Sequence, residues 1–308
     1  MSASLPSGLA RRLNGGQFVM TAEVVPPVSC DPVDLLAIAA PLKGLADAVN
    51  VTDAAGARAQ MSATAAAALL VRAGIEPILQ LTCRDRNRIA LQGELMGAAA
   101  LGIRNLLLLR GDDPTAGDQP DAKPVFDLDS RTLTETARTI GDHGKLPHGV
   151  QVAGRAAFFI GAADMPIDPP PGWQPDTLEA KIAAGTQFVQ TQFCMDTGVV
   201  RRYTARLAEA GLAGRVFVLI GVNPLRSARS AAWMRHHLFG TIIPDAMVAR
   251  MEAAADPAAE GRRICIEVIE ELATIPGVAG AHVMAPGNAA AIPDVIAAVR
   301  SKVPGANP

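Results

Sequence analysis

Aromatic residues are scarce in this 308-residue sequence, where they make up 4% of the chain and Tyr203 is the only tyrosine. Few side chains are therefore available to stack on nucleic-acid bases. The sequence also lacks a block rich in lysine and arginine, and its formal net charge is −2. Proteins that bind nucleic acid usually gather positive charge to neutralise phosphates. These absences argue against a nucleic acid as partner.

Metal-ligand motifs are missing as well. The adjacent pair His236-His237 is most simply the exposed face of a helix, so we expect no metal site. Free, scattered thiols are typical of proteins in a reducing cytoplasm. The four cysteines form no CxxC motif and no Cys/His pair of ligand spacing: Cys30, Cys83, Cys194 and Cys265.

No apolar stretch is long enough to cross a membrane, and no membrane contact is expected. The first 14 residues contain Arg11-Arg12, but no apolar segment of a secretory signal follows them. We therefore expect a cytoplasmic protein whose residues 1–15 form a flexible N-terminal extension.

The common phosphate-binding motifs are also absent. Neither GxGxxG nor GxxxxGK[ST] occurs where a strand passes into a helix. The turn after the first predicted strand is Pro26-Pro27, whereas a Rossmann sheet requires a glycine-rich turn there. A dinucleotide-binding open sheet is therefore disfavoured.

Strand-like and helix-like segments alternate about eight times along the chain. This alternation predicts a parallel sheet, and eight units in about 300 residues favour a closed (β/α)8 barrel over an open sheet. We predict that residues 1–308 form a single catalytic domain of this fold. The predicted strands are Phe18–Val25, Ala46–Val51, Pro77–Thr82, Arg104–Leu109, Gly149–Ile160, Phe188–Phe193, Val216–Ile220 and Ala281–Met284.

Polar residues recur at the ends of these strands, where the active sites of barrels lie. Each one alone has a structural explanation, as a strand-end cap, a turn former or an ion-pair partner. A barrel would bring all of them into one ring, which favours a functional site. They are Glu23, Thr52, Asp53, Gln80, Thr82, Arg110, Asp112, Gln192 and Asn223.

Two carboxylates in this ring, Glu23 and Asp112, are the best candidates for chemistry. Glu23 lies near the C-terminal end of a strand that is otherwise almost wholly apolar, where a carboxylate is costly unless it is paired, hydrated or protonated. If one carboxyl is desolvated and the other is solvated, their pKa values separate and the first can donate a proton at neutral pH. No nucleophile with a paired base is recognisable.

Five short motifs now point to a family. The chain resembles the methylenetetrahydrofolate reductases from about Phe18 to Met284, because these motifs occur in the same order as in that family. The ordered set is more specific than any one motif. The motifs are Glu23-x-x-Pro26-Pro27, Leu81-Thr82-Cys83, Leu109-Arg110-Gly111-Asp112, Lys181-Ile182-Ala183-Ala184-Gly185 and Thr191-Gln192-Phe193.

The resemblance implies an oxidoreductase of one-carbon metabolism. It implies that FAD binds at the C-terminal ends of the barrel strands, and that NADH or NADPH and 5,10-methylenetetrahydrofolate use it in turn in a ping-pong scheme. The product would be 5-methyltetrahydrofolate. The sequence does not distinguish NADH from NADPH, methionine biosynthesis from methyl-group catabolism, or a monomer from a homo-oligomer.

The resemblance also implies roles for individual residues. Glu23 would be the general acid that opens the five-membered ring of the substrate to an iminium cation. Asp112 would contact both flavin and substrate, and Gln192 would hydrogen-bond the pterin. The residues implied to hold FAD are Thr52, Arg110, Gly111, Asp112 and Lys181.

Several positions depart from the family pattern. Gln80 stands where many members have histidine, and Asp53 where tyrosine is frequent. Phe158–Ala162 replaces a Tyr-Pro-Glu-x-His-like segment in strand five, and residues 226–228 lack the aromatic side chain that stacks on substrate. These departures leave two alternatives open, both barrels that bind folate without flavin. One is a methyltransferase, and the other is a folate-binding subunit that needs a partner protein.

Overall fold

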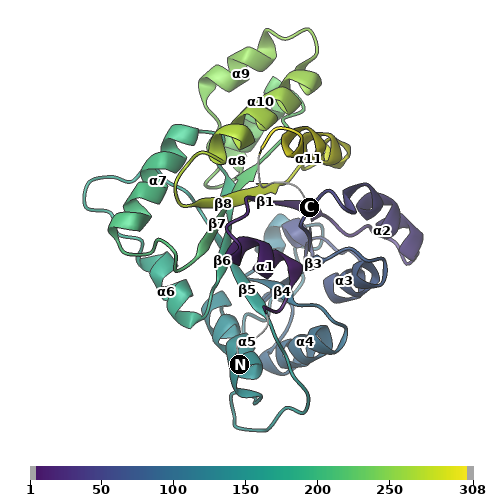
Figure 1. Ribbon diagram of the computed structural model, residues 1–308. Coiled ribbons are helices and arrows are strands. Elements are labelled where there is room, and N and C mark those ends of the chain that lie inside the picture. Colours follow the sequence, from purple (N-terminus) through teal and green to yellow (C-terminus); the bar gives the residue numbers. More distant parts are fainter. Residues whose placement is uncertain (1–4, 304–308) are drawn as a thin grey trace.

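The chain folds as a closed barrel of eight parallel strands, ordered β1 to β8 around the ring (Figure 1). The structure is a computed structural model that describes residues 5–303. The predicted (β/α)8 fold is confirmed. The strands are β1 (Val19–Val24), β2 (Ala48–Val51), β3 (Pro77–Thr82), β4 (Asn105–Leu109), β5 (Phe159–Asp164), β6 (Phe188–Phe193), β7 (Phe217–Val222) and β8 (Val278–Val283).

Helices surround the barrel, and prolines mark where several of them begin. Pro32 and Pro257 occupy first-turn positions, where the missing N–H costs nothing, and Pro244 caps α9. Within the described residues, no helix is long and apolar enough to cross a membrane. The α-helices are α1 (Gly8–Asn14), α2 (Pro32–Ala39), α3 (Ala63–Arg72), α4 (Arg88–Ala100), α5 (Ser130–His143), α6 (Asp176–Ala184), α7 (Thr197–Glu209), α8 (Ala228–His237), α9 (Asp245–Glu252), α10 (Pro257–Leu272) and α11 (Ile292–Arg300); the 3-10 helices are η1 (Ala40–Leu42), η2 (Ala55–Ala57), η3 (Pro114–Ala116) and η4 (Ala289–Ala291).

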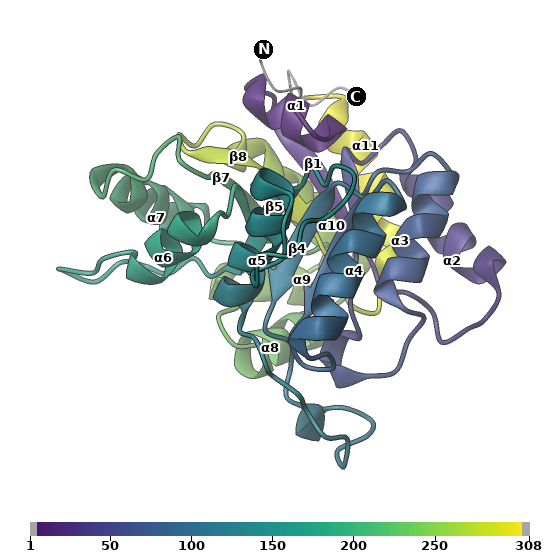
Figure 2. The same ribbon diagram turned by 90° about the horizontal axis from the view of Figure 1, so that it is seen from below.

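Helix α1 lies within the segment that was expected to be a flexible extension, and for residues 8–14 that expectation is wrong. Leu9 and Leu13 are buried in an apolar cluster with side chains from the barrel interior. The Glu76 carboxylate accepts hydrogen bonds from the backbone N–H groups of Gly8 and Leu9 at 2.9 and 2.8 Å. A carboxylate there satisfies free N–H groups and complements the helix dipole. Helix α1 therefore closes the N-terminal end of the barrel, opposite α8 (Figure 2). Residues 1–4 lie outside the described residues.

Strand β5 begins ten residues later than predicted. The segment before it contains Gly149 and Gly154, both with positive φ, and a short antiparallel bridge joins Lys145 to Gln151. Glycines in such conformations form turns rather than strands. The apolar run that pairs with β4 and β6 is Phe159–Asp164, so the strand ends in a carboxylate that the prediction placed in a loop.

The interior of the barrel is stacked in layers, as is usual for this fold. The layer above α1 is apolar and includes the stacked rings of Phe159 and Phe188, whose centroids are 4.9 Å apart. Gly161 leaves room for this stack, because a Cβ atom there would come within 2.3 Å of the Phe188 ring. The next layer towards the strand ends is polar and consists of buried side chains from four strands: Thr21, Asn50, Gln190 and His282. This polar layer forms the base of the candidate site.

Candidate active site

A cavity of about 680 Å³ opens at the C-terminal ends of the strands. Its volume is typical of small-molecule sites, as is its mixture of apolar walls and a few polar groups. The polar lining includes Glu23, Gln80, Asp164, Lys181, Gln190, Gln192 and His282, and the apolar lining includes Leu107, Leu109, Trp173, Phe239 and Met284.

Glu23 enters this cavity from the end of β1. Successive side chains of a strand point to opposite faces of the sheet. Met20, Ala22 and Val24 therefore point outward, into the core between the barrel and the helices, and Glu23 points into the barrel. Burial alone raises the pKa of the Glu23 carboxyl to about 7. A carboxyl group in this state exists in both protonation forms at neutral pH, which is what a general acid requires.

The polar layer beneath Glu23 is a connected hydrogen-bond network. The Gln190 amide nitrogen donates to Asn50 Oδ1 at 2.9 Å and to Thr21 Oγ1 at 3.0 Å, and Gln190 Oε1 accepts from Asn50 Nδ2 at 2.6 Å. His282 Nδ1 lies 2.9 Å from Thr21 Oγ1. Burial lowers the pKa of His282 to about 3, so its imidazole is neutral at physiological pH. The network fixes the side chains at the base of the cavity.

His282 was not among the predicted site residues, because most histidines fall in helices or loops. The available signal was its place in a predicted strand, on the interior side between Ala281 and Val283. Asp164 was missed for a related reason, since the boundaries of β5 were wrong. The run of apolar residues that ends in Asp164 was its signal.

Asp164 joins two other side chains at the cavity wall. The hydroxyl of Tyr203, the only tyrosine, donates a short hydrogen bond to Asp164 Oδ2. Lys181 Nζ lies 3.8 Å from Asp164 Oδ1 and donates to the carbonyl oxygen of Ala163 at 2.6 Å. Burial and the Asp164 charge both raise the pKa of Tyr203, so the phenol stays protonated. Lys181 therefore enters the site from α6, held by the end of β5.

Gln192 lies at the end of β6 and lines the cavity. Its Nε2 donates to the carbonyl oxygen of Phe239 at 3.3 Å, and its Oε1 accepts from the Phe193 N–H at 3.0 Å. Both functions of the amide are thus engaged by the chain itself.

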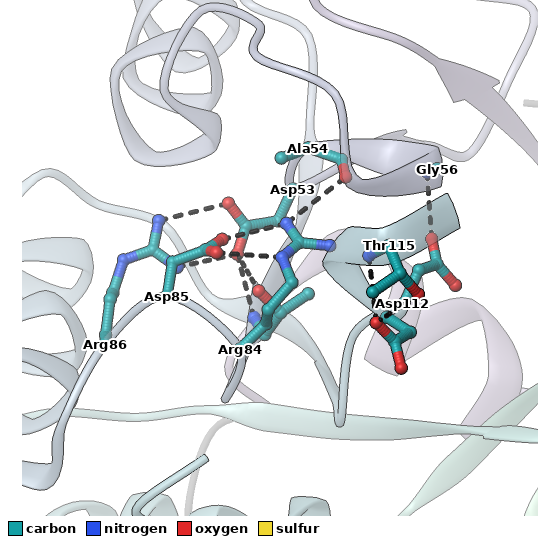
Figure 3. A network of polar contacts seen from close by, with 10 residues as sticks. Asp53, Ala54, Gly56, Arg84, Asp85, Arg86, Asp112 and Thr115 are labelled. Carbon is teal, nitrogen blue, oxygen red and sulfur yellow. Dashed lines mark hydrogen bonds and ion pairs between the residues drawn. The ribbon is translucent and has the colours of Figure 1, made fainter. Parts of the chain in front are cut away.

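A second polar group lies beyond the ends of β2, β3 and β4 (Figure 3). Asp53 is its centre: Arg86 donates to both carboxylate oxygens, at 2.7 and 3.1 Å, and the backbone N–H and hydroxyl of Thr82 donate to Oδ2 at 2.8 and 2.9 Å. Beside it, Arg84 is buried and donates to Asp85 through two nitrogens, each at 2.8 Å. These contacts tie the loop after β2 to the loop after β3.

The Arg110-Gly111-Asp112 segment follows β4 and packs against the same loops. Asp112 Oδ2 accepts a hydrogen bond from the Gly56 N–H at 2.8 Å, so the predicted catalytic carboxylate also holds the loop after β2 (Figure 3). The guanidinium of Arg110 lies 4.5 Å from the centre of the Phe126 ring. Gly111 has φ +93°, and a Cβ atom there would lie 3.0 Å from the Cβ atoms of both Thr82 and Arg84. Glycine is thus required by the turn itself.

The structure divides the predicted site residues into two groups. Glu23, Gln192 and Lys181 line the cavity together with Gln80. The others lie outside its lining: Thr52, Asp53, Thr82, Arg110, Gly111, Asp112 and Asn223.

Two further observations concern possible ligands. The hydroxyl oxygen of Thr52 is buried and has no hydrogen-bond partner. The Nδ2 atom of Asn223 donates a hydrogen bond to Met234 Sδ at 3.4 Å. Among residues 5–303, no group of three or more His, Cys, Asp or Glu side chains is arranged to hold a metal ion.

The fold and the cavity define a (β/α)8-barrel protein with a cavity of small-molecule size at the C-terminal ends of its strands. The sequence profile of the family described as methylenetetrahydrofolate reductase matches residues 9–300. The chain therefore belongs to the methylenetetrahydrofolate reductase family, as its motifs indicated.

Curated relatives carry the same family name. A probable methylenetetrahydrofolate reductase (NADPH) of Caenorhabditis elegans is 28% identical over 174 residues, which is 55% of this chain and 23% of that protein. Methylenetetrahydrofolate reductase 2 of Saccharomyces cerevisiae is 27% identical over 209 residues, or 65% of this chain and 32% of that protein. The matched segments thus span about a quarter to a third of these relatives.

Two solved structures share the fold at low identity. A protein from Clostridium thermocellum, described as binding two copies of 5-methyl-5,6,7,8-tetrahydrofolic acid, matches with a TM-score of 0.62 and 12% identity, covering 96% of this chain and 99% of that one. DmoA from Hyphomicrobium sulfonivorans matches with a TM-score of 0.57 and 11% identity, covering 93% and 88%. At these identities the likeness shows the fold alone.

Proposed function

We propose that this chain reduces 5,10-methylenetetrahydrofolate to 5-methyltetrahydrofolate, with NADH or NADPH as electron donor. The observation that carries the proposal is Glu23, a carboxyl group at the end of β1 that lines the cavity and whose pKa is raised to about 7 by burial. Family membership supplies the substrate class, and Glu23 supplies the proton that the reaction needs.

The role of Glu23 follows from the structure of the substrate. A carbon–nitrogen bond in the five-membered ring must break before the methylene carbon can be reduced. The protonated carboxyl of Glu23 gives its proton to the leaving nitrogen, and the methylene carbon is left as an iminium cation. The resulting Glu23 carboxylate then faces a positive charge, which stabilises the ionised form of an otherwise desolvated group.

Other side chains would orient the substrate. Gln192 offers an amide to the pterin once its bond to the Phe239 carbonyl is exchanged for one to the ligand. The neutral network of Gln190, Asn50 and His282 keeps further charge away from the base of the cavity. Asp112 would act on the ligand from the rim of the cavity, through the charge of its carboxylate. The same carboxylate accepts the hydrogen bond from the Gly56 N–H.

The residues present fit a flavin as the resident cofactor. The cavity has apolar walls and amide groups at the strand ends, and the buried Thr52 hydroxyl beyond β2 has no hydrogen-bond partner. Lys181 would hold FAD from the cavity wall, and Thr52, Arg110, Gly111 and Asp112 would hold it from outside the cavity lining, beyond the ends of β2 and β4, with Arg110 and Lys181 contributing positive charge. When bound, the flavin supplies a hydride to the methylene carbon after accepting one from the nicotinamide.

An absorbance spectrum of the purified protein, followed by titration with FAD, tests this assignment. A stoichiometric flavin spectrum that NADH or NADPH bleaches under anaerobic conditions, and that 5,10-methylenetetrahydrofolate then restores, is the expected result. A protein that binds reduced folate but cannot be loaded with FAD would contradict the flavin-dependent route. That result would favour a folate enzyme that works without flavin.

A further inference from the structure

Asp164 is a carboxylate in the cavity wall that the proposed reaction does not yet use. It ends β5, and its side chain is 11% exposed, so it is largely withdrawn from solvent and still reaches the cavity. Among the described residues that line the cavity, only Glu23 and Asp164 carry a carboxyl group. Asp112, which the resemblance implies as a substrate contact, is exposed and lies outside the lining. A ligand in the cavity therefore meets Asp164 rather than Asp112.

The chain itself engages only part of this carboxylate. The hydroxyl of Tyr203 donates to Oδ2, and the Tyr203 ring is buried against Trp173, with ring centroids 5.9 Å apart. Lys181 Nζ lies 3.8 Å from Oδ1, which is longer than a hydrogen bond. Within residues 5–303, Oδ1 accepts no hydrogen bond. Since a carboxylate offers about four acceptor positions, Asp164 keeps several of them for a ligand.

Strand pairing places Asp164 beside a second polar group of the site. Asp164 is paired with Thr191 of β6, and Gln192, the next residue along that strand, lines the same cavity. A carboxylate and an amide thus lie at the ends of neighbouring strands. The bond from Tyr203 holds the carboxylate in place before a ligand arrives, which lowers the entropy cost of binding.

The pyrimidine end of a reduced folate is complementary to such a carboxylate. Its 2-amino group and its N3–H point outward from one edge of the ring, as two N–H groups of a guanidinium do. Paired donors of this kind bind the two oxygens of a carboxylate through parallel hydrogen bonds. Oδ1 of Asp164 is open to such a bond, and Oδ2 keeps an acceptor position beside the one that Tyr203 fills.

We propose that Asp164 is a substrate-binding residue that accepts hydrogen bonds from the 2-amino group and the N3–H of the pterin. The inference rests on the proposed function, because it takes a reduced folate as the ligand of the cavity. The pterin edge is neutral, so Lys181 supplies the counter-charge that keeps Asp164 from being buried alone. A ligand without the paired donors leaves the carboxylate unpaired, which makes Asp164 a determinant of specificity.

The test measures binding of two ligands by calorimetry: 5-methyltetrahydrofolate, and its analogue with hydrogen in place of the 2-amino group. The proteins are the wild type, Asp164→Asn and Asp168→Asn. Asp168 is the matched control, because it pairs with Arg202 at 2.7 Å, its side chain is 59% exposed, and it lies outside the cavity lining. In Asp164→Asn the amide oxygen still accepts from Tyr203, whereas the amide NH2 faces the donors of the pterin.

We expect the wild type and Asp168→Asn to bind the analogue at least about 10-fold more weakly than 5-methyltetrahydrofolate, because hydrogen bonds to a charged group are strong. Asp164→Asn should bind 5-methyltetrahydrofolate at least about 10-fold more weakly than the wild type, and should distinguish the two ligands by less than about 3-fold. In turnover assays of Asp164→Asn, KM for the folate should rise, while KM for the nicotinamide stays within about 2-fold of the wild type.

Equal affinity of the wild type for the two ligands would overturn the role of Asp164, however the variants fold, and would leave the proposed function standing. Unchanged folate affinity in Asp164→Asn, together with a raised KM for NADH or NADPH, would assign the carboxylate to a ribose diol and would also overturn it. A wild type that binds no reduced folate would overturn both the role of Asp164 and the proposed function.

Discussion

The guanidinium of Arg86 donates to both oxygens of the Asp53 carboxylate, which in turn holds the backbone and hydroxyl of Thr82. The side chain of Asp53 is only 5% exposed and that of Arg86 is 18% exposed. A single ion pair thus fixes the loops after β2 and β3 at the rim of the site.

We predict that Asp53→Asn lowers the free energy of unfolding by about 2–3 kcal/mol, because it leaves Arg86 partly buried without its counter-charge. The measurement is urea denaturation. Glu135→Gln is the matched control, since Glu135 pairs with Arg131 on the exposed face of α5 and its loss should cost less than about 0.5 kcal/mol. Equal costs for the two variants would mean that the Asp53 pair is no more important than a surface pair.

A second prediction concerns Gly111. Replacement by alanine should destabilise the protein by about 1–3 kcal/mol, because the residue would keep a positive φ and its Cβ would press on Thr82 and Arg84. Gly44→Ala separates the two causes: Gly44 has φ +75°, but no atom lies within 4 Å of the place that a Cβ would occupy there. If Gly44→Ala costs as much as Gly111→Ala, the close packing after β4 contributes nothing.

The raised pKa of Glu23 predicts how stability depends on pH. The folded state binds the Glu23 proton more tightly than the unfolded state, where the pKa is about 4.5. The stabilisation is therefore complete below pH 4.5 and is lost as the pH rises through about 7. Glu23→Gln has no such proton, so its stability relative to the wild type should increase between pH 5 and pH 8, by as much as about 3 kcal/mol. A constant difference across this range, in denaturation at several pH values, would show that the carboxyl is not desolvated.

Asp112 offers a test of charge against contact. In Asp112→Asn the amide oxygen still accepts from the Gly56 N–H, so the loop contact survives while the charge is lost. If Asp112 acts on the ligand, the rate of folate reduction should fall about 10-fold and unfolding should be unchanged. Asp112→Ala removes the contact as well and serves as the comparison. Full activity of the Asn variant would assign Asp112 to the loop contact alone.

Much of this fold can be predicted from the sequence because local signals agree with the final structure. Strands β3 and β6 were predicted at their observed limits, since each is an apolar run bounded by turn residues. Strand β5 was misplaced because Gly149 and its neighbours precede an irregular segment with some apolar residues. Helix α1 was missed because its stability comes from Leu9 and Leu13 in the barrel and from Glu76, contacts distant in sequence.

The site could be predicted only in part for a similar reason. A position at a strand end can be read from alternation, which found Glu23, Gln192 and the loops at the rim. What each side chain contacts depends on neighbouring strands and loops. Asp164 and His282 could be found only where the limits and register of β5 and β8 are right, and Phe239 reaches the cavity through the turn after α8.

The most direct test of the proposed function compares 5-methyltetrahydrofolate formation by the wild type and by Glu23→Gln, each loaded with FAD and supplied with NADH or NADPH. We expect the variant to lose about 10²- to 10⁴-fold in folate reduction, while its oxidation of the nicotinamide with an artificial electron acceptor stays within a few-fold of the wild type. Equal loss of both half-reactions, or full folate reduction by the variant, would contradict the role of Glu23 as the proton donor.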